Sequence, residues 1–335
     1  MLLALIFTMM LMMRTVRPFK AIARLQRAKV SAAAPRSPSP NSLTSPTDFG
    51  EKFSVPPIPT SRLSLQKKNP CALDEKITFD EKTHTYTLNG KPVKYSVTEI
   101  IEEFFEKFDG PVVVKKMMNG NNWPRPEYMT RDNSRPLTEE EILDKWDKIG
   151  LYARNRGEPY RLLTYRRINI CIPNTGTWMH HNIERYLNGL EYVSDIPEMS
   201  HFMEFHEDHI QNRIIPYRTE WRIGCPIHNI AGTVDFVGRK SNGNYVIIDW
   251  KRSKNLADNL SNGFNRKAKY PLHGMDDCDG MKYSLQLNMY RYILQQHYGM
   301  VVDNLIVASF HPNLETYFSF DVEVIYLLHT RVLLI

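Results

Sequence analysis

Apolar segments separated by turn residues dominate the second half of the chain. Residues 233–237 and 245–250 are rich in Val, Ile, Phe and Tyr, and they flank the sequence Ser-Asn-Gly-Asn at 241–244. Two such segments around a short turn that contains glycine predict a β-hairpin. The apolar segment 304–310 predicts a further strand, and residues 318–322 with the apolar tail to Ile335 are predicted to complete the sheet and to form a closing helix. We therefore expect a central sheet in this part of the chain.

Two other segments have the apolar spacing of helices. One helix is predicted to open after Gly176 and to close at Gly189. The other is predicted over residues 283–294, after the hairpin. Strands combined with helices before and after them predict an α/β protein with a mixed central sheet, helices on both sides and carboxylates at one edge.

A smaller hairpin and helix unit is predicted ahead of this core, over residues 76–157. Residues 77–90 contain two short strands around a polar turn, and Ser96 begins a helix that leads into residues 100–108. Thr138 repeats the helix-start signal. This unit either shapes a gate or channel for a strand or completes the core.

The predicted hairpin brings two carboxylates and a lysine together. Side chains alternate along a strand, so Asp249 and Lys251 point the same way, Trp250 points to the other side, and Asp235 can reach them from the neighbouring strand. Two carboxylates suit Mg²⁺ or Mn²⁺, and a lysine beside them can position a water or stabilise charge on a phosphate. The alternative is an ordinary surface ion pair. The buried character of residues 245–248 favours the site, because a core strand that ends on a carboxylate needs a partner or a metal.

The two helices add polar residues at helical spacing. His180 and Glu184 share one helix face and can supply metal ligands or orient them, although a single histidine is more often a satisfied core residue. Gln286 and Tyr290 lie one turn apart on the later helix, where they can hydrogen-bond a water, a phosphate or a base. An ordinary amphipathic helix is the alternative there.

The order of these features is more specific than any one of them. Along residues 175–295 the chain shows Gly-x3-His on a helix, Glu220 on a strand, Gly-x2-Asp, Asp-x-Lys and finally Gln-x3-Tyr on a helix. This order resembles the PD-(D/E)XK (restriction-endonuclease-like) nucleases, and within them the RecB-like branch, which includes mitochondrial genome-maintenance exonucleases.

The resemblance implies a role for each matching residue. The residues it assigns to one or two metal ions are His180, Asp235, Asp249 and the backbone carbonyl of Trp250. Lys251 becomes the catalytic lysine beside the two aspartates, and Glu220 matches a recurring acidic position that we group with the catalytic residues. Gln286 and Tyr290 match the supporting motif.

The implied activity is metal-dependent hydrolysis of phosphodiester bonds in DNA. An exonuclease that trims single-stranded ends or flaps during mitochondrial DNA replication or repair is the expected function. Two alternatives stay open: a catalytically inactive nuclease fold that binds nucleic acid, and an RNA-processing nuclease, since metal ions do not distinguish the two phosphate backbones.

The number and spacing of the cysteines bear on which metal centres the chain can form. Four are present, without any Cys-x2-Cys pair: Cys71, Cys171, Cys225 and Cys278. Their spacing argues against a structural zinc site, a disulfide framework and the iron–sulfur cluster of some RecB-like nucleases.

The positive charge is unevenly distributed. The formal net charge is +6, but residues 1–47 hold seven basic residues and no acidic one, which leaves 36 basic and 37 acidic residues and a net charge of −1 elsewhere. Any DNA path is therefore a local patch. The best candidate has Phe264 and Tyr270 interleaved for stacking, and its basic residues are Lys251, Arg252, Lys254, Arg266, Lys267 and Lys269. A solvated loop is an equal alternative.

The first 47 residues have the composition of a targeting segment. An Arg-rich, acid-free and Ser-containing start is typical of an organellar transit peptide, so we expect the mitochondrial matrix. The apolar run at 2–13 keeps a secretory signal as the minority alternative, and no stable membrane span is expected. Residues 48–75 are predicted to be a flexible approach to a fold that starts near Lys76.

Residues 158–175 interrupt the chain where related sequences run directly into the histidine helix. Without this segment and one flanking glycine, the chain would continue as Asn-Arg-Gly-Thr-Trp-Met-His-His. We interpret the segment as an insertion or a mispredicted exon boundary, and we place the nuclease core at 176–335.

Overall fold

The computed structural model describes residues 58–324 except 60–61, 82, 108, 149–174 and 262–265. Its main sheet has the strand order β5-β6-β7-β8-β9, with β4 also paired to β6. The strands are β4 (Tyr95–Ser96), β5 (Ile214–Cys225), β6 (Ile230–Lys240), β7 (Tyr245–Lys251), β8 (Val302–Ser309) and β9 (Phe318–Asp321). Pairs β4·β6 and β7·β8 are parallel and the others antiparallel, which confirms the predicted mixed sheet.

The predicted hairpin is the pair β6 and β7. Its turn is tight: the Asn244 amide donates to Oδ1 of Asn242 at 3.0 Å, and Gly243 has a φ of +86°, which glycine adopts without steric cost. After β7 the chain must cross over before it can pair in parallel with β8. Helix α9 (Asp279–His297) makes this crossover, and it contains the helix predicted at 283–294.

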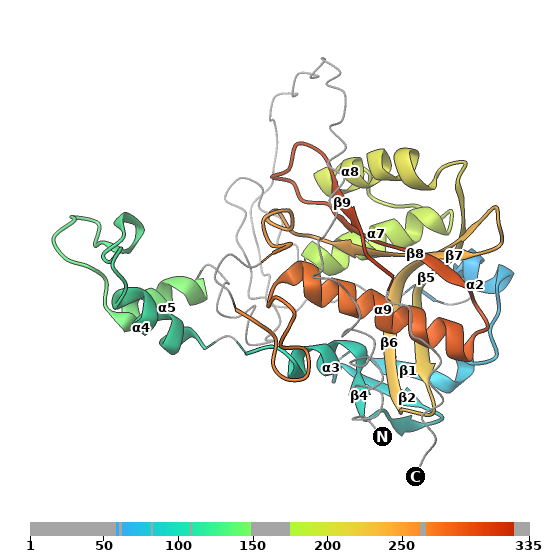
Figure 1. Cartoon of the computed structure of the whole chain (residues 1–335). Coiled ribbons are helices and arrows are strands. Elements are labelled where there is room, and N and C mark those ends of the chain that lie inside the picture. Colours follow the sequence, from blue (N-terminus) through green and yellow to red (C-terminus); the bar gives the residue numbers. More distant parts are fainter. Residues whose placement is uncertain are drawn as a thin grey trace, which may run out of the picture.

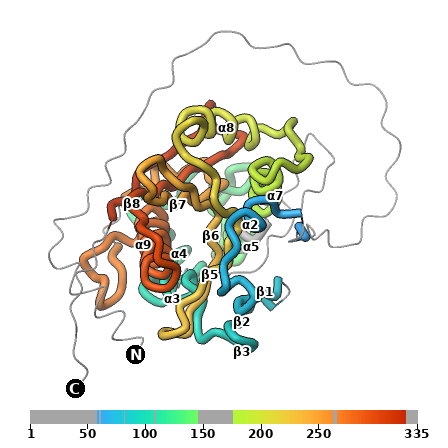
Figure 2. The backbone as a smooth tube through the Cα atoms, turned by 90° about the vertical axis from the view of Figure 1, so that its right-hand side faces the viewer, coloured from blue at the N-terminus to red at the C-terminus, as the bar shows by residue number. Residues whose placement is uncertain are grey.

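Helices cover both faces of the sheet, as predicted. Helix α9 and α3 (Val97–Glu103) pack on one face with Ile247. Helices α7 (Thr175–Leu187) and α8 (Pro197–Phe205), the latter followed by the π-helical turn η4 (His206–Ile210), cover the other face with Trp250. Figure 2 shows α9 and α7 on opposite sides of β5 and β6. Trp250 therefore lies on the face opposite α9, as the strand alternation predicts.

A second, three-stranded sheet precedes the core. Strands β1 (Ile77–Asp80), β2 (Thr85–Leu88) and β3 (Lys91–Pro92) are antiparallel, and their buried side chains pack on Ala231 of β6. This confirms the two short strands expected in 77–90. This small sheet therefore extends the core along β6.

Helix α3 begins where the sequence predicts but ends early. Ser96 forms a reciprocal capping box with Glu99. The helix ends at Glu103 and not at 108, since the amides of Phe104 and Phe105 turn to the carbonyls three residues back. The Phe104 carbonyl then accepts a hydrogen bond from the Lys269 amide, so it is used for a tertiary contact.

Packed structure begins before the predicted start near Lys76. Helix α2 (Ser64–Lys68) buries Leu65, and the short helix η2 (Asp74–Lys76) follows it. Asp74 accepts hydrogen bonds from Arg218 and from the Trp221 indole on β5. The part of the 48–75 segment from α2 onward is thus docked on the sheet.

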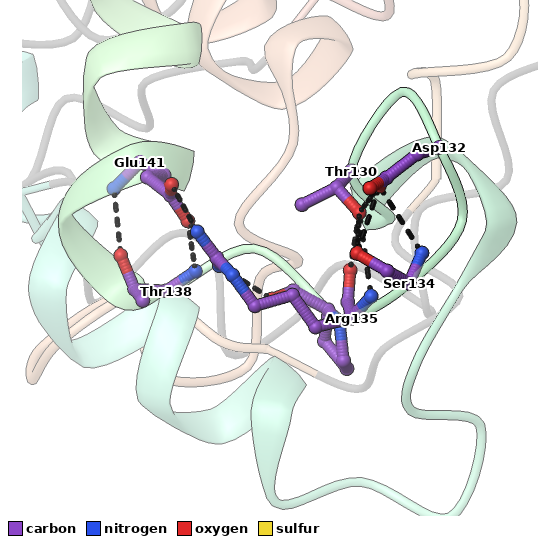
Figure 3. A network of polar contacts seen from close by, with 7 residues as sticks. Thr130, Asp132, Ser134, Arg135, Thr138 and Glu141 are labelled. Carbon is purple, nitrogen blue, oxygen red and sulfur yellow. Dashed lines mark hydrogen bonds and ion pairs between the residues drawn. The ribbon is translucent and has the colours of Figure 1, made fainter.

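Helices α4 (Gly110–Met118) and α5 (Glu139–Lys148) project from the body of the molecule (Figure 1). They pack on each other through the fully buried side chains of Val114 and Ile142. The connection between them contains the short helix η3 (Pro126–Tyr128) and is closed by polar contacts (Figure 3). Arg135 makes two 2.8 Å hydrogen bonds to the carboxylate of Glu141. The helix start predicted at Thr138 is confirmed.

Several sequence predictions lie outside the described residues. They concern 1–47, most of the segment 158–175 and the chain after 324. Among the described residues, none of the helices has the length and apolar character needed to cross a membrane.

Candidate metal and catalytic site

Three carboxylates occupy matching register positions on three neighbouring strands. The β6–β7 ladder ends at the pair Phe236 and Ile248, so the next positions, Asp235 and Asp249, face each other. On the other side of β6, the ladder pairs that flank Glu220 place it opposite Asp235. The carboxylates thus extend across β5, β6 and β7. The expectation that they lie at one edge of the sheet is wrong, because β6 and β7 are inner strands.

The site occupies an opening between strands. Strand β5 pairs along the whole of β6, so β4 and β7 share the other side of β6. Strand β4 pairs at Ile230 and Ala231, whereas β7 pairs only from Phe236 onward. Where β7 leaves β6, Oδ2 of Asp235 accepts a 2.8 Å hydrogen bond from the Trp250 amide. A side chain therefore replaces a backbone partner at this point.

Helix α7 brings His180 to this opening. The neighbouring Met179 and Ile183 are buried in the same cluster as Trp250, which fixes the helix against the sheet. Nδ1 of His180 lies 3.1 Å from Oε1 of Glu220, and Nε2 lies 3.1 Å from the Trp250 carbonyl oxygen.

Ligand atoms of three residues are close enough to share one metal ion. Nδ1 of His180 is 3.7 Å from Oδ1 of Asp235. Ligand atoms of His180, Glu220 and Asp235 all lie within 4.8 Å of one another, and in the described part of the chain no other group of three does so. Glu220 has a φ of +42°, which is uncommon for a residue other than glycine and indicates local backbone strain.

Lys251 and Asp249 form an ion pair beside this group. Nζ of Lys251 lies 2.7 Å from Oδ2 of Asp249 and 4.5 Å from the centre of the Tyr283 ring on α9. Asp249 is 2% exposed, so its charge has little help from water. Sequence analysis missed Tyr283, although it lies three residues before Gln286 and seven before Tyr290, a spacing that indicates one helix face.

The buried acids hold protons more tightly than usual. Burial raises the pKa of Asp235, and it raises the pKa of Asp249 to about 6, although Lys251 opposes this. Burial and the nearby Glu220 raise the pKa of Glu184, one turn after His180, to about 8. The site therefore has more carboxylates than it can keep ionised by itself, which is the condition that a bound cation relieves.

His180 responds in the opposite sense. Burial would lower the pKa of its imidazole, but Asp235 and Glu220 outweigh burial and raise it to about 9. Both ring nitrogens face oxygen atoms of the site. The positive imidazolium thus compensates the same carboxylates whose charge a bound metal ion would compensate.

Gln286 and Tyr290 are hydrogen-bonded to each other on α9, and Tyr290 lies against β6. Nε2 of Gln286 donates to the Tyr290 hydroxyl at 3.0 Å, and Tyr290 is buried. Its ring lies against Gly232 of β6, where a Cβ atom would come within 2.7 Å of Cε1. The glycine of the Gly-x2-Asp motif is therefore required for α9 to approach β6.

Arg252 does not contribute to an open basic patch. Its Nε lies 2.6 Å from Oε1 of Glu198 on α8, and both side chains are largely buried. The role of Arg252 in DNA binding stays a prediction, and in this structure its guanidinium is paired with Glu198. Lys254 is exposed, as are Lys269 and the 69% exposed Tyr270. Lys267 is paired with Asp276, and Phe264 lies outside the described residues.

Comparisons with known proteins do not place this chain in a family. No family model matches the chain, and no curated protein matches it. The solved structure titled "Structure of EndoMS-dsDNA2 complex" is 24% identical over 33% of this chain and 36% of that chain, with a TM-score of 0.18. "Crystal structure of SSO0001" is 15% identical over 39% of this chain and 50% of that chain, with a TM-score of 0.21. The chain thus spans half or less of these structures, and TM-scores this low carry no argument.

Proposed function

We propose that the chain is a metal-dependent nuclease with a PD-(D/E)XK core, acting on DNA as an exonuclease of single-stranded ends or flaps. One observation carries the proposal. The carboxylates on three strands, the imidazole of His180 and the Trp250 carbonyl converge where β6 and β7 separate, with Lys251 alongside. The residues that converge here belong to the motifs whose order along the sequence resembles that of the PD-(D/E)XK nucleases.

The donor atoms fit Mg²⁺ or Mn²⁺. Carboxylate and carbonyl oxygens suit both ions, and the imidazole nitrogen of His180 favours Mn²⁺, which binds nitrogen more tightly. The residues that would hold the metal are His180, Asp235, Asp249 and the carbonyl of Trp250, with Glu220 beside them. When bound, the ion supplies positive charge for the scissile phosphate and lowers the pKa of a bound water.

Lys251 is suited to orient the reacting groups. Burial would lower the pKa of its ammonium, but Asp249 and Asp235 outweigh burial and raise it. The side chain therefore stays protonated at neutral pH and can donate hydrogen bonds to a phosphate oxygen or a water. Its position over the Tyr283 ring limits its movement.

The preference for single-stranded DNA rests on two features. The order of the motifs resembles that of DNA exonucleases, and Tyr270, next to Lys269, exposes an aromatic face on which a base can stack. The Lys269 amide donates a hydrogen bond to the carbonyl of Phe104, directly after α3, so the backbone that carries Lys269 and Tyr270 is held against the protein.

Cleavage assays on the full chain test the proposal. We would mix it with end-labelled single-stranded, flapped and duplex DNA and with RNA of matched sequence, in Mg²⁺, Mn²⁺ or EDTA. Asp249→Ala and Lys251→Gln should lower cleavage at least about 100-fold. Asp303→Asn is the matched control, because Asp303 pairs with Lys240 at the far end of the hairpin.

The outcomes separate the alternatives. Metal-dependent loss of single-stranded ends that fails in Asp249→Ala but not in Asp303→Asn supports the proposal. Binding without cleavage in both wild type and Asp249→Ala would indicate an inactive nuclease fold. Faster cleavage of RNA than of matched DNA would indicate an RNA-processing enzyme.

A further inference from the structure

A second group of metal-binding side chains lies at the turn between β5 and β6. Cys225 is the last residue of β5 and is 1% exposed. Its Sγ lies 3.0 Å from Nε2 of His297, the last residue of α9. His228 lies in the turn, and its Nε2 is 3.4 Å from the Tyr292 hydroxyl. None of these residues takes part in the nuclease site.

The turn is folded around the sulfur atom. Its sequence is Cys225-Pro-Ile-His228-Asn229, and burial raises the pKa of the Cys225 thiol, while the nearby backbone amides of His228 and Ile227 act in the opposite direction. Asn229 has a φ of +53°, which returns the chain to β6. Amides that point at a cysteine two and three residues earlier stabilise a thiolate, as in the Cys-x2-Cys turns of metal sites. Here a histidine takes the place of the second cysteine.

We propose that Cys225, His228 and His297 bind a zinc ion at the end of α9. One thiolate and two imidazoles form a donor set that zinc prefers, and a water can complete the tetrahedron. The proposal departs from the sequence expectation of no structural zinc site. That expectation rested on the lack of Cys-x2-Cys, and it did not consider a Cys-x2-His turn completed by a histidine 69 positions later in the sequence.

The geometry requires two small adjustments. Zinc bonds of about 2.3 Å to sulfur and about 2.1 Å to nitrogen separate the two ligand atoms by about 3.6 Å in a tetrahedron. The present separation of 3.0 Å between Cys225 and His297 must therefore open slightly. The His228 ring must also turn, since among the described residues only His180, Glu220 and Asp235 place ligand atoms within 4.8 Å of one another.

Rotation of the His228 ring would break few hydrogen bonds. Its Nδ1 is buried without a hydrogen-bond partner, and its Nε2 has only the long contact with Tyr292. An unpaired buried nitrogen costs free energy that metal binding would recover. The neighbouring Ile227 is 64% exposed, so the turn has space to move.

A metal here would fasten the β5–β6 turn to α9. Tyr283 of the same helix lies against Lys251 of the proposed nuclease site. The proposed role is therefore structural, and it does not depend on the nuclease proposal.

Cobalt replacement tests the site directly in the full chain. A Co²⁺ ion bound to a thiolate gives a charge-transfer band in the near ultraviolet, which the carboxylate and imidazole ligands of the nuclease site cannot give. We expect one equivalent of Co²⁺ to produce the band and Zn²⁺ to abolish it. The band should be absent in Cys225→Ser, and Co²⁺ affinity should fall at least about tenfold in His297→Gln and His228→Gln.

A matched control uses another buried cysteine. Cys278 donates its thiol to the Leu260 carbonyl, so Cys278→Ser should keep the band. Zn²⁺ should also raise the unfolding temperature of the chelator-stripped wild type by more than that of Cys225→Ser, in which only the nuclease site can bind it. If Cys225→Ser does not fold, the two histidine variants carry the test. No band in wild type, a band that survives in Cys225→Ser, or an affinity unchanged in His228→Gln would overturn the proposal.

Discussion

Asp235 accepts a 2.8 Å hydrogen bond from the backbone amide of Trp250, at the first position beyond the β6–β7 ladder. One carboxylate therefore has two tasks. Its Oδ2 completes the hydrogen bonding of a strand that is leaving the sheet, while its Oδ1 faces His180 in the site. Stability and function can be separated at this residue.

Asp235→Asn should lose function without losing stability. The amide oxygen of the asparagine can still accept the hydrogen bond from Trp250, and the substitution removes a buried charge. In EDTA the variant should therefore be at least as stable as wild type. Asp235→Ala leaves the Trp250 amide unpaired and should be less stable than Asp235→Asn by about 1–3 kcal/mol. Urea unfolding and cleavage rates measure the two effects. Equal stability of the two variants would show that the Trp250 amide does not depend on this side chain.

Glu184→Gln should change how stability depends on pH. Burial and Glu220 raise the pKa of Glu184 to about 8 in the folded protein, above its value in the unfolded chain. The folded state thus keeps a proton that the unfolded state releases, and this group lowers stability as pH rises from the unfolded pKa through the folded one. The advantage of Glu184→Gln over wild type in EDTA should grow by about 2 kcal/mol between pH 6 and pH 9.

The control for this measurement is Glu191→Gln, an exposed position just after α7. Its stability difference from wild type should stay constant over the same pH range. A constant difference for Glu184→Gln as well would contradict the burial of a protonated carboxyl beside Glu220.

Gly232→Ala should disturb both the core and the site. A Cβ atom there would lie 2.7 Å from Cε1 of Tyr290 and 3.3 Å from Cβ of Val97, so the ring and α9 must move. We expect a loss of about 1–3 kcal/mol in unfolding free energy and slower cleavage, because Tyr290 and Gln286 shift together. Gly274→Ala is the control, since a Cβ atom at Gly274 meets no heavy atom within 4 Å. Equal behaviour of the two variants would refute the close approach.

Substitution of Arg252 should lower protein stability, whereas substitution of Lys254 should weaken DNA binding. Arg252→Gln leaves Glu198 buried without its cation and should destabilise the protein by about 3 kcal/mol, and the double change Arg252→Met with Glu198→Leu should recover most of that loss. Lys254→Gln should leave unfolding unchanged and weaken DNA binding, with the slope of log affinity against log salt reduced by about one. A stable Arg252→Gln with a reduced salt slope would instead place Arg252 on the DNA path.

Local patterns in the sequence predicted the elements that carry the site. Alternation over 245–250 located β7 and separated Trp250 from Asp249, and the motif Ser-x2-Glu located the start of α3. These signals are local because strand periodicity and helix capping depend on neighbours within a few residues.

Long-range pairing could not be predicted in the same way. The level of Glu220 on β5 depends on its register with β6, and the loss of Arg252 from the basic patch depends on Glu198, 54 residues earlier in the sequence. The amphipathic patterns of α4 and α5 likewise do not predict that these helices project from the body. Such patterns indicate only that each helix has an apolar face to bury, and here the two faces are buried against each other.

The backbone carbonyl of Trp250 cannot be deleted by any substitution, yet its position can be altered. The indole is held among Phe202, Phe205, Phe236 and Phe310 on the face of the sheet away from α9. These aromatic rings are buried in the core. In the proposed nuclease, substitutions among these rings would shift the Trp250 carbonyl oxygen, so variants of this core should be assessed together with variants of the proposed site residues.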